Sequence, residues 1–245
     1  MVEPLLEESS APRRSDRDEN VAASVDGDNG RIVPTAIGVP LSTPDGVCRA
    51  TEFPMNGSRN QNPAGMGLWA LFREDLRTHG IFFSQGLWAL SVNRFGNWRM
   101  DRNKLVRILT RPMYMFAYRL VHWITRLELP YIVKCGRRVR IWHHGGCVLG
   151  ACEIGDDVQI RHNITFGLST HGDPIHQLPI IEDRVIIGAG AAIVGPIRIG
   201  HDSIVGANAV VTKDVPPYSL VAGIPAKVIR KLEEKPLLTH VETKV

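Results

Sequence analysis

The chain has 245 residues, and its 44% hydrophobic content is enough to bury a core in one large domain or two small ones. The formal net charge of +4 is too small and too dispersed to indicate nucleic acid as a partner. Four cysteines without CxxC spacing indicate neither a zinc knuckle nor a disulfide framework, which favours a cytoplasmic setting. No stretch has the roughly 18 apolar residues of a membrane span, and the N-terminus lacks the apolar segment of a signal peptide.

Residues 1–64 are rich in Pro, Ser, Asn, Asp and Gly, and Phe53 is their only aromatic residue. Such a segment buries too little apolar surface to offset the entropy of ordering it. We therefore predict a disordered tail here. A tail that folds on a partner is the less favoured alternative.

A small helical domain is predicted over residues 65–130. In LWALFREDLRTH, residues 68–79, and LWALSVNRFGNWR, residues 87–99, apolar residues recur every three or four positions. The pattern continues over residues 104–128, where Pro112 should start a second helix. We expect these helices to pack on one another and on a neighbouring subunit. A membrane-surface helix is the alternative, because aromatic residues here alternate with Arg107, Arg111, Arg119 and Arg126.

After residue 139 an aliphatic residue or Phe recurs at every sixth position in two runs, at Ile154, Ile160 and Phe166, then at Ile181, Ile187, Ile193, Ile199, Val205 and Val211. Neither a helix nor a simple alternating strand requires this period, but a coil of short strands joined by tight corners does. Turn-forming pairs such as Asp156-Asp157 and Ala207-Asn208 fall at the expected corners. The sequence therefore predicts a narrow prism with one bulky residue per strand pointing inward.

Two stretches resemble hexapeptide-repeat acyltransferases of the serine acetyltransferase type: IGDDVQIRHNITFG, residues 154–167, and VIIGAGAAIVGPIRIGHDSIVGANAVVTKDVPPYSLVAGIPAKVI, residues 185–229. The segment GLWALSVNRFGNWR matches the family more loosely. The resemblance implies a mainly β fold, with a left-handed parallel β-helix over residues 131–232 and a C-terminal tail over residues 233–245. The handedness comes from the resemblance alone, since ordinary crossovers are right-handed.

The resemblance also implies acetyl-CoA as the acyl donor, bound between neighbouring subunits of a homotrimer or of a dimer of trimers. No metal is expected. The pantetheine arm would pass the corners Gly188-Ala189 and Gly206-Ala207, where a small side chain permits close approach. The CoA phosphates would meet Lys213, Lys227 and Arg230.

In the family a histidine on an early coil takes the proton from the acceptor hydroxyl, and this motif maps to IWHHGG, residues 141–146. Counting back from Gly150 without a gap selects His143, whereas the following Gly selects His144. His144 also lies 18 residues before His162, one turn of three hexapeptides, so an unbroken register would stack the two. We expect His144 to be the general base and His143 to be the alternative.

Departures from the family pattern leave the acceptor open. Trp142 or His143 stands where a carboxylate usually precedes the base, and Leu178 stands where an ungapped match requires histidine. Asp173 and His176 are expected to substitute and, with His162, to bind the acceptor. The acidic pair of the family's helical domain is not recognisable, although Glu74 and Asp75 are nearby.

L-serine, the acceptor used in cysteine biosynthesis, is implied by the resemblance. The alternative is a sugar hydroxyl, as in exopolysaccharide synthesis. Two other classes are less favoured. A γ-carbonic-anhydrase-like metal enzyme would need two histidines five apart on a strand, a spacing matched only by His171 and His176 in a loop. A non-catalytic scaffold would have no use for the retained histidine corner.

Overall fold

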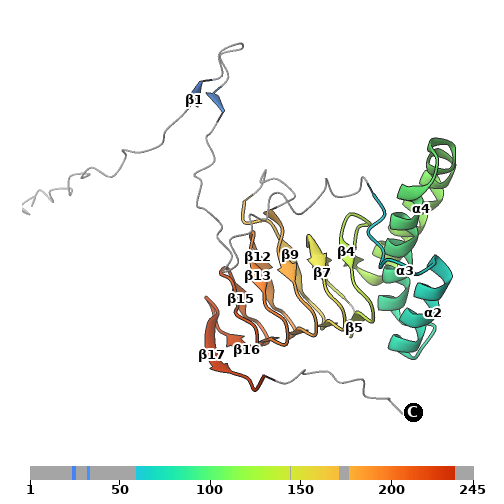
Figure 1. Cartoon of the computed structure of the whole chain (residues 1–245). Helices are drawn as coiled ribbons and strands as arrows, with labels where there is room; N and C mark the ends of the chain where they lie inside the picture. The colour runs from blue at the N-terminus through green and yellow to red at the C-terminus, as the bar shows by residue number, and fades with distance from the viewer. Residues whose placement is uncertain (1–23, 26–31, 34–58, 144, 171–176, 235–245) are drawn as a thin grey trace, which may run out of the picture. The chain divides into compact units, whose positions relative to one another are not determined.

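The computed structural model describes residues 24–25, 32–33, 59–143, 145–170 and 177–234 (Figure 1). The chain divides into two units, residues 1–48 and 49–245. In the first unit, strands β1 (Ser24–Val25) and β2 (Ile32–Val33) pair antiparallel. The rest of the predicted tail up to residue 58 lies outside the described residues.

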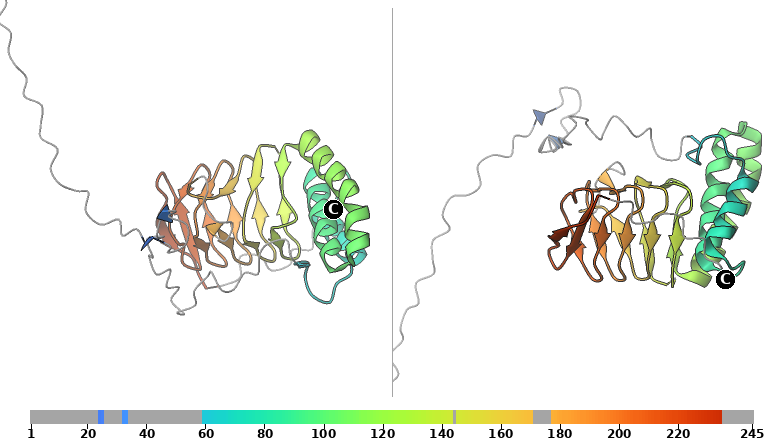
Figure 2. Two further views of the ribbon diagram at one scale, coloured as in Figure 1. Left: turned by 90° about the horizontal axis from the view of Figure 1, so that it is seen from above. Right: turned by 60° about the horizontal axis from the view of Figure 1, so that its bottom comes forward.

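The helical region of the second unit consists of α2 (Leu68–His79), α3 (Gln85–Trp98), the short 3₁₀ helix η1 (Arg99–Asp101) and α4 (Lys104–Thr125). Figure 2 shows these helices gathered at one end of the strands. Helix α3 packs against both α2 and α4. Residues just before the predicted boundary belong to this region, because the side-chain amide of Asn60 donates to Asp101 Oδ2 at 2.8 Å and that of Asn62 donates to the Arg94 carbonyl at 2.9 Å.

The prediction that Pro112 starts a new helix is wrong, since α4 continues through it. Proline cannot donate to the carbonyl four residues earlier, that of Ile108, and this usually bends or ends a helix. Pro112 lies on the exposed side of α4. Water can therefore bond to the carbonyl that proline leaves unpaired, and the helix tolerates the residue.

The remaining strands form three sheets with the orders β13-β10-β7-β4, β17-β16-β14-β11-β8-β5 and β15-β12-β9-β6-β3. Every pairing in them is parallel except that of β17 with β16. Consecutive strands enter successive sheets, which makes a three-sided coil (Figures 1 and 2). The strand bounds are β3 Leu127–Glu128, β4 Lys134–Cys135, β5 Arg140–Ile141, β6 Cys147–Leu149, β7 Glu153–Ile154, β8 Gln159–Ile160, β9 Thr165–Gly167, β10 Ile180–Ile181, β11 Ile186–Ile187, β12 Ala192–Val194, β13 Arg198–Ile199, β14 Ile204–Val205, β15 Val210–Val211, β16 Ser219–Ala222 and β17 Lys227–Lys231.

The core confirms the predicted period of six. Eight of the nine repeat residues are completely buried, and the ninth, Val211, is 2% exposed. Burying one such aliphatic side chain contributes about 1.5–3 kcal/mol. At the predicted corners, Asp157 and Asn208 adopt positive φ angles of 58° and 56°, a backbone conformation that Asp and Asn tolerate better than most residues.

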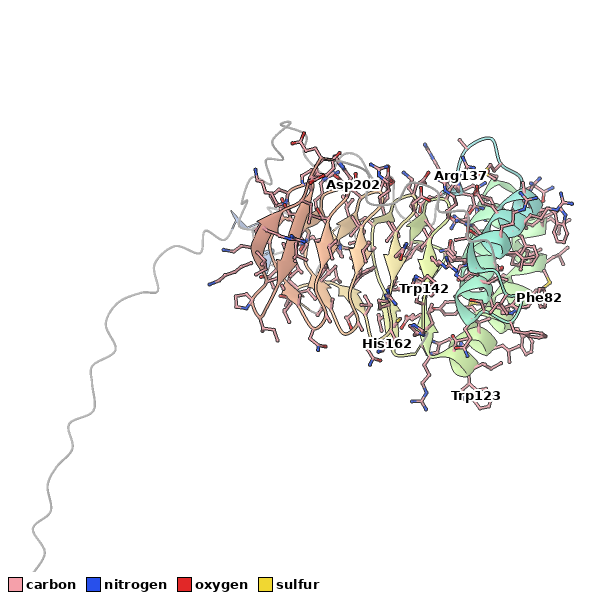
Figure 3. The ribbon with its side chains drawn as sticks, turned by 90° about the horizontal axis from the view of Figure 1, so that it is seen from below. Phe82, Trp123, Arg137, Trp142, His162 and Asp202 are labelled. Carbon is pink, nitrogen blue, oxygen red and sulfur yellow. The ribbon has the colours of Figure 1, made fainter. Side chains whose placement is uncertain are left out.

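Buried polar contacts attach the helices to the first coil. The guanidinium of Arg94 is 1% exposed; it donates through Nη1 to the carbonyl of Cys135 and through Nη2 to that of Gly136, both at 2.5 Å. Its Nε lies 3.3 Å from Asp75 Oδ2. Glu74 forms a further ion pair, at 2.6 Å, with Arg137 (labelled in Figure 3). Glu74 and Asp75, which lie near the expected position of the family's acidic pair, thus have structural partners.

Candidate functional site

The candidate site is the corner between β5 and β6, which holds the paired histidines. Strand pairing aligns Ile141 with Ile160 and Val148 with Thr165. At this corner the chain advances seven positions, from Ile141 to Val148. At the equivalent corner of the next coil it advances only five, from Ile160 to Thr165. The two extra residues make the corner bulge outward, and it turns through Gly145 and Gly146 with φ angles of 129° and 65°.

The bulge changes which histidine lies beside His162. Because Ile141 pairs with Ile160, the strand register at this position is 19 residues rather than 18. The stacking predicted for His144 therefore falls to His143, whose ring centroid lies 6.2 Å from that of His162 in an edge-to-face arrangement. His143 is exposed and has a φ angle of 47°. His144 itself lies outside the described residues.

The residue before the base, where the family pattern has a carboxylate, is Trp142 or His143, depending on which histidine is the base. The guanidinium carbon of Arg140 lies 3.9 Å from the Trp142 ring centroid, and that of Arg161 lies 5.6 Å away. Such contacts are cation–π interactions. Figure 3 labels Trp142 and His162, which come from neighbouring coils. This part of the site therefore offers aromatic and cationic groups to an acceptor.

Two polar atoms at this corner are buried without a hydrogen-bond partner among the described residues: Trp142 Nε1 and His162 Nδ1. Buried polar groups in native proteins are nearly always paired with protein or water. The expected partner of each orphan atom is therefore a water molecule or a group outside the described residues.

The sequence analysis missed the support beneath the corner. Asn163 adopts a φ angle of 55° and donates its backbone N–H to the Gly145 carbonyl at 3.0 Å. A side chain at Gly146 would place its Cβ only 2.6 Å from Asn163 Oδ1. Asn163 belongs to the IRHN stretch, residues 160–163, that the sequence singles out. Its contact with Gly145 and Gly146 becomes clear only when the strands are paired and the two-residue bulge is seen.

Helix α2 reaches the same strand from behind through His79. The imidazole Nδ1 donates to the Asp75 carbonyl at 2.9 Å, so Nε2 is left as an acceptor that faces the Ile141 N–H at 3.4 Å. Burial lowers the pKa of His79, and the nearby Arg140 adds to this effect, although the Asp75 hydrogen bond opposes it. His79 is thus held neutral against Ile141, the residue that precedes Trp142 and the histidine corner.

The predicted acetyl-CoA corners lie in stacked coils, because β11 pairs with β14 and β14 with β16. The glycines at these corners also allow the coils to stack. A Cβ on Gly188 would lie 2.5 Å from the backbone nitrogen of Ala207, and one on Gly206 would lie 3.0 Å from the Cβ of Ala222. The missing side chains are therefore needed for the coils to stack, while Ala207 is exposed toward solvent.

The other predicted ligands are dispersed. Lys213 follows β15, whereas Lys227 and Arg230 lie on β17, and all three side chains are exposed. Asp173 and His176 lie outside the described residues. Leu178 sits near Gly150, because its Cδ2 would be 3.6 Å from a Cβ built there. Among the described residues, no three His, Cys, Asp or Glu side chains come together as a candidate metal site.

The family model for the bacterial transferase hexapeptide (six repeats) matches residues 179–213. The serine acetyltransferase of Mycobacterium tuberculosis (strain ATCC 25618 / H37Rv) is 41% identical over 158 residues, which are 64% of this chain and 66% of that protein. The serine acetyltransferase of Helicobacter pylori (strain J99) is 39% identical over 133 residues, or 52% of this chain and 77% of that protein. The chain spans only about half of the length, 53%, of other curated relatives that it matches.

Among solved structures, the chain resembles serine acetyltransferase from Brucella abortus strain S19 in complex with coenzyme A. The TM-score is 0.57 at 25% identity, and the match covers 66% of this chain and 67% of that one. The likeness identifies the three-sided coil as the left-handed parallel β-helix that the sequence resemblance implied. Together with the sequence identities, it shows that the chain belongs to the serine acetyltransferase family of hexapeptide-repeat acyltransferases.

Proposed function

We propose that the protein is an O-acetyltransferase that uses acetyl-CoA and works from the bulged corner of its first coil. The observation that carries this proposal is His143 beside His162 on a two-residue bulge, in a chain whose relatives are named serine acetyltransferases. The Brucella structure with coenzyme A supports acetyl-CoA as the donor. The test is release of free CoA from acetyl-CoA in the presence of an acceptor, with parent protein and corner variants side by side.

The proposed reaction is direct transfer. An imidazole nitrogen takes the proton of the acceptor hydroxyl as its oxygen attacks the thioester carbonyl carbon. The tetrahedral intermediate then collapses, the C–S bond breaks, and the CoA sulfur leaves and takes up the proton. A hydroxyl is a weak nucleophile, so a positioned general base contributes about 10²- to 10⁴-fold in rate.

We assign the base to His143, with His144 as the alternative. One of the two reasons for preferring His144 was its expected stacking on His162, and the observed register gives that neighbour to His143. The other reason, the glycine that follows His144, is unchanged. Counting back from Gly150 selects the same residue. His143 is also exposed, as a group that receives a proton from an incoming substrate must be.

For the donor, the corners Gly188-Ala189 and Gly206-Ala207 would flank the pantetheine arm, and the cations Lys213, Lys227 and Arg230 would meet the phosphates. Ala207 is exposed, and the other three corner residues are partly exposed. Support comes from the small residues that directly follow β11 and β14, which the pairing of these strands places one above the other. The exposed cations of the last coils give further support. These side chains would bind and orient CoA without taking part in proton transfer.

We propose L-serine as the acceptor, following the relatives. One observation favours a second candidate, a sugar hydroxyl: Trp142, flanked by Arg140 and Arg161, replaces the carboxylate that would hold an ammonium group. Asp173 and His176 remain proposed acceptor ligands. Parallel CoA-release assays with L-serine and with free hexoses decide between the two, because saturable release with only one class identifies the acceptor.

A cytoplasmic setting is also proposed. Cys135, Cys147 and Cys152 are buried and form no disulfide among the described residues, and burial raises the pKa of Cys135 to about 12. Thiols kept protonated in this way are unreactive and behave as small apolar core residues.

A further inference from the structure

Helix α4 exposes a wide apolar face. Of its 22 residues only Tyr114 and Thr125 are buried within the single chain. The sequence predicts that these helices pack on one another and on a neighbouring subunit. Trp123 is 81% exposed, Phe116 70% and Leu109 66%. The other large exposed apolar residues of this helix are Leu105, Ile108, Met113, Met115, Leu120 and Ile124. An apolar patch of this extent on a soluble fold marks a binding surface.

All of the charged residues in this helix are basic. The stretch KLVRILTRPMYMFAYRLVHWIT contains four basic residues, Lys104, Arg107, Arg111 and Arg119, and no Asp or Glu. None of these four forms an ion pair with another described residue. Spacings of three and four place Lys104, Arg107 and Arg111 along one side of the helix. The apolar face is thus bordered by unneutralised positive charge.

A cavity of about 630 Å³ opens where this charged border meets η1. Its lining includes four cations, Arg99, Lys104, Arg107 and Arg111, with Ile108 and Met115 of the apolar face, and contains no acidic residue. Arg99 is buried; it donates from Nε to Thr110 Oγ1 at 3.0 Å and from Nη2 to the Arg107 carbonyl at 3.2 Å. Burial lowers the pKa of Arg99, and Arg107 and Arg111 lower it further. A phosphate group is the anion that several convergent guanidinium groups bind best.

We infer that α4 docks the protein on a membrane surface rich in anionic phospholipid, with the apolar face at the level of the acyl chains and the cationic cavity on a lipid phosphate. Basic amphipathic helices with aromatic residues on the apolar side bind membranes in this way. The described helices include none that is long and apolar enough to cross a bilayer, so α4 would lie on the surface. The exposed loop residues Phe82 and Phe83 add apolar area at the same helical end, where Figure 3 labels Phe82 and Trp123.

Charge decides between a lipid surface and a second copy of the chain. A second α4 would bring the same cations and no carboxylate of its own, so the borders of the two helices would repel each other. An anionic membrane supplies both partners that the helix lacks, apolar chains and negative charge. This docking is independent of which acceptor the enzyme uses.

The test is flotation of the full-length protein with vesicles of phosphatidylcholine alone or of phosphatidylcholine with phosphatidylglycerol. We expect at least about tenfold more bound protein on the anionic vesicles, and a loss of binding as salt is raised.

Three double variants identify the residues responsible. Arg107→Gln/Arg111→Gln should abolish the preference for anionic lipid. The matched control Arg73→Gln/Arg77→Gln removes two exposed charges from α2 and should bind like the parent. Phe116→Ser/Trp123→Ser should bind weakly even at low salt, and thermal melts must show that every variant folds.

Equal binding to both vesicle types, or equal losses in the control and the Arg107/Arg111 variant, would overturn the inference. Light scattering gives the remaining decisive outcome. If the parent ignores vesicles but forms an assembly larger than a trimer that Phe116→Ser/Trp123→Ser breaks, α4 is a contact between copies and the lipid proposal is wrong. CoA release by the same samples separates this result from a failure of the proposed acetyl transfer.

Discussion

At the scale of single residues, the position of His143 depends on chain length as much as on side-chain chemistry. Two extra residues push the corner outward, and Gly145 and Gly146 allow the chain to return to β6. We expect His143→Ala to lower kcat by about 10²- to 10⁴-fold while the Kd for CoA is unchanged, because the base contacts the acceptor hydroxyl and not the cofactor. His144→Ala should cost clearly less. Steady-state CoA release and calorimetric titration of CoA measure the two quantities.

The reverse order, with His144→Ala the more damaging, would transfer the role of base to His144. Near-parental turnover in both single variants and in the double variant would show that the corner supplies no base. His162 would then be the next residue to replace.

A second residue-scale prediction concerns His79. Its folded-state pKa is lowered by burial, so the folded protein binds this proton less readily than the unfolded chain does. The resulting stability is fully present above the unfolded pKa of about 6.5 and is lost as pH falls below it. We expect His79→Gln to flatten the fall in unfolding free energy between about pH 7 and pH 5. Urea titrations across this range measure the slope, and an unchanged slope would contradict the prediction.

At the scale of elements, each coil is stabilised by one large inward residue per strand. Ile187 is fully buried, whereas its neighbour Ile186 on the same strand is only half-buried. Ile187→Ala should therefore cost about 2–5 kcal/mol of unfolding free energy, through lost burial and the cavity left behind. Ile186→Ala, which removes the same atoms from a position outside the core, should cost much less. Equal losses in chemical denaturation would argue against an inward-facing column.

The link between helices and β-helix gives a further prediction at this scale. Arg94→Met would leave the Asp75 carboxylate buried without its cation, at a cost of about 3–5 kcal/mol. The double variant Arg94→Met/Asp75→Asn removes that charge and should recover part of the loss. Thermal and chemical denaturation of the parent, Arg94→Met, Asp75→Asn and the double variant completes the cycle. A double variant no more stable than Arg94→Met would mean that the carbonyl contacts, rather than the charge, dominate.

The β-helix could be predicted from the sequence because its rule is local: each hexapeptide supplies its own inward residue and corner. The bulge at residues 142–147 could not, since a two-residue difference becomes visible only when strands are paired, and this changed the histidine beside His162. The path of α4 through Pro112 also escaped prediction, and the sequence left open whether a neighbouring subunit or a membrane surface covers the apolar face of this helix. Periodicity shows that a helix has an apolar face but not what covers that face.

At the scale of the whole molecule, we expect a homotrimer with the active site shared between neighbouring subunits. The expectation comes from the family resemblance, which implies an acetyl-CoA crevice between neighbouring subunits of a closed symmetric assembly. Light scattering should give three chain masses, or six for a dimer of trimers. A fully active monomer would contradict the assembly.

Subunit mixing tests the shared site directly. His143→Ala removes the proposed base, and Ala207→Trp fills an exposed corner proposed for pantetheine, so each variant alone should be inactive. If the base and the CoA corner of one site come from different subunits, every mixed trimer regains one intact site. Co-expression in equal amounts should then restore about a quarter of the parental sites, since three-quarters of random trimers are mixed and each has one good site in three. Mixed samples as inactive as the single variants would show instead that each subunit builds its site alone.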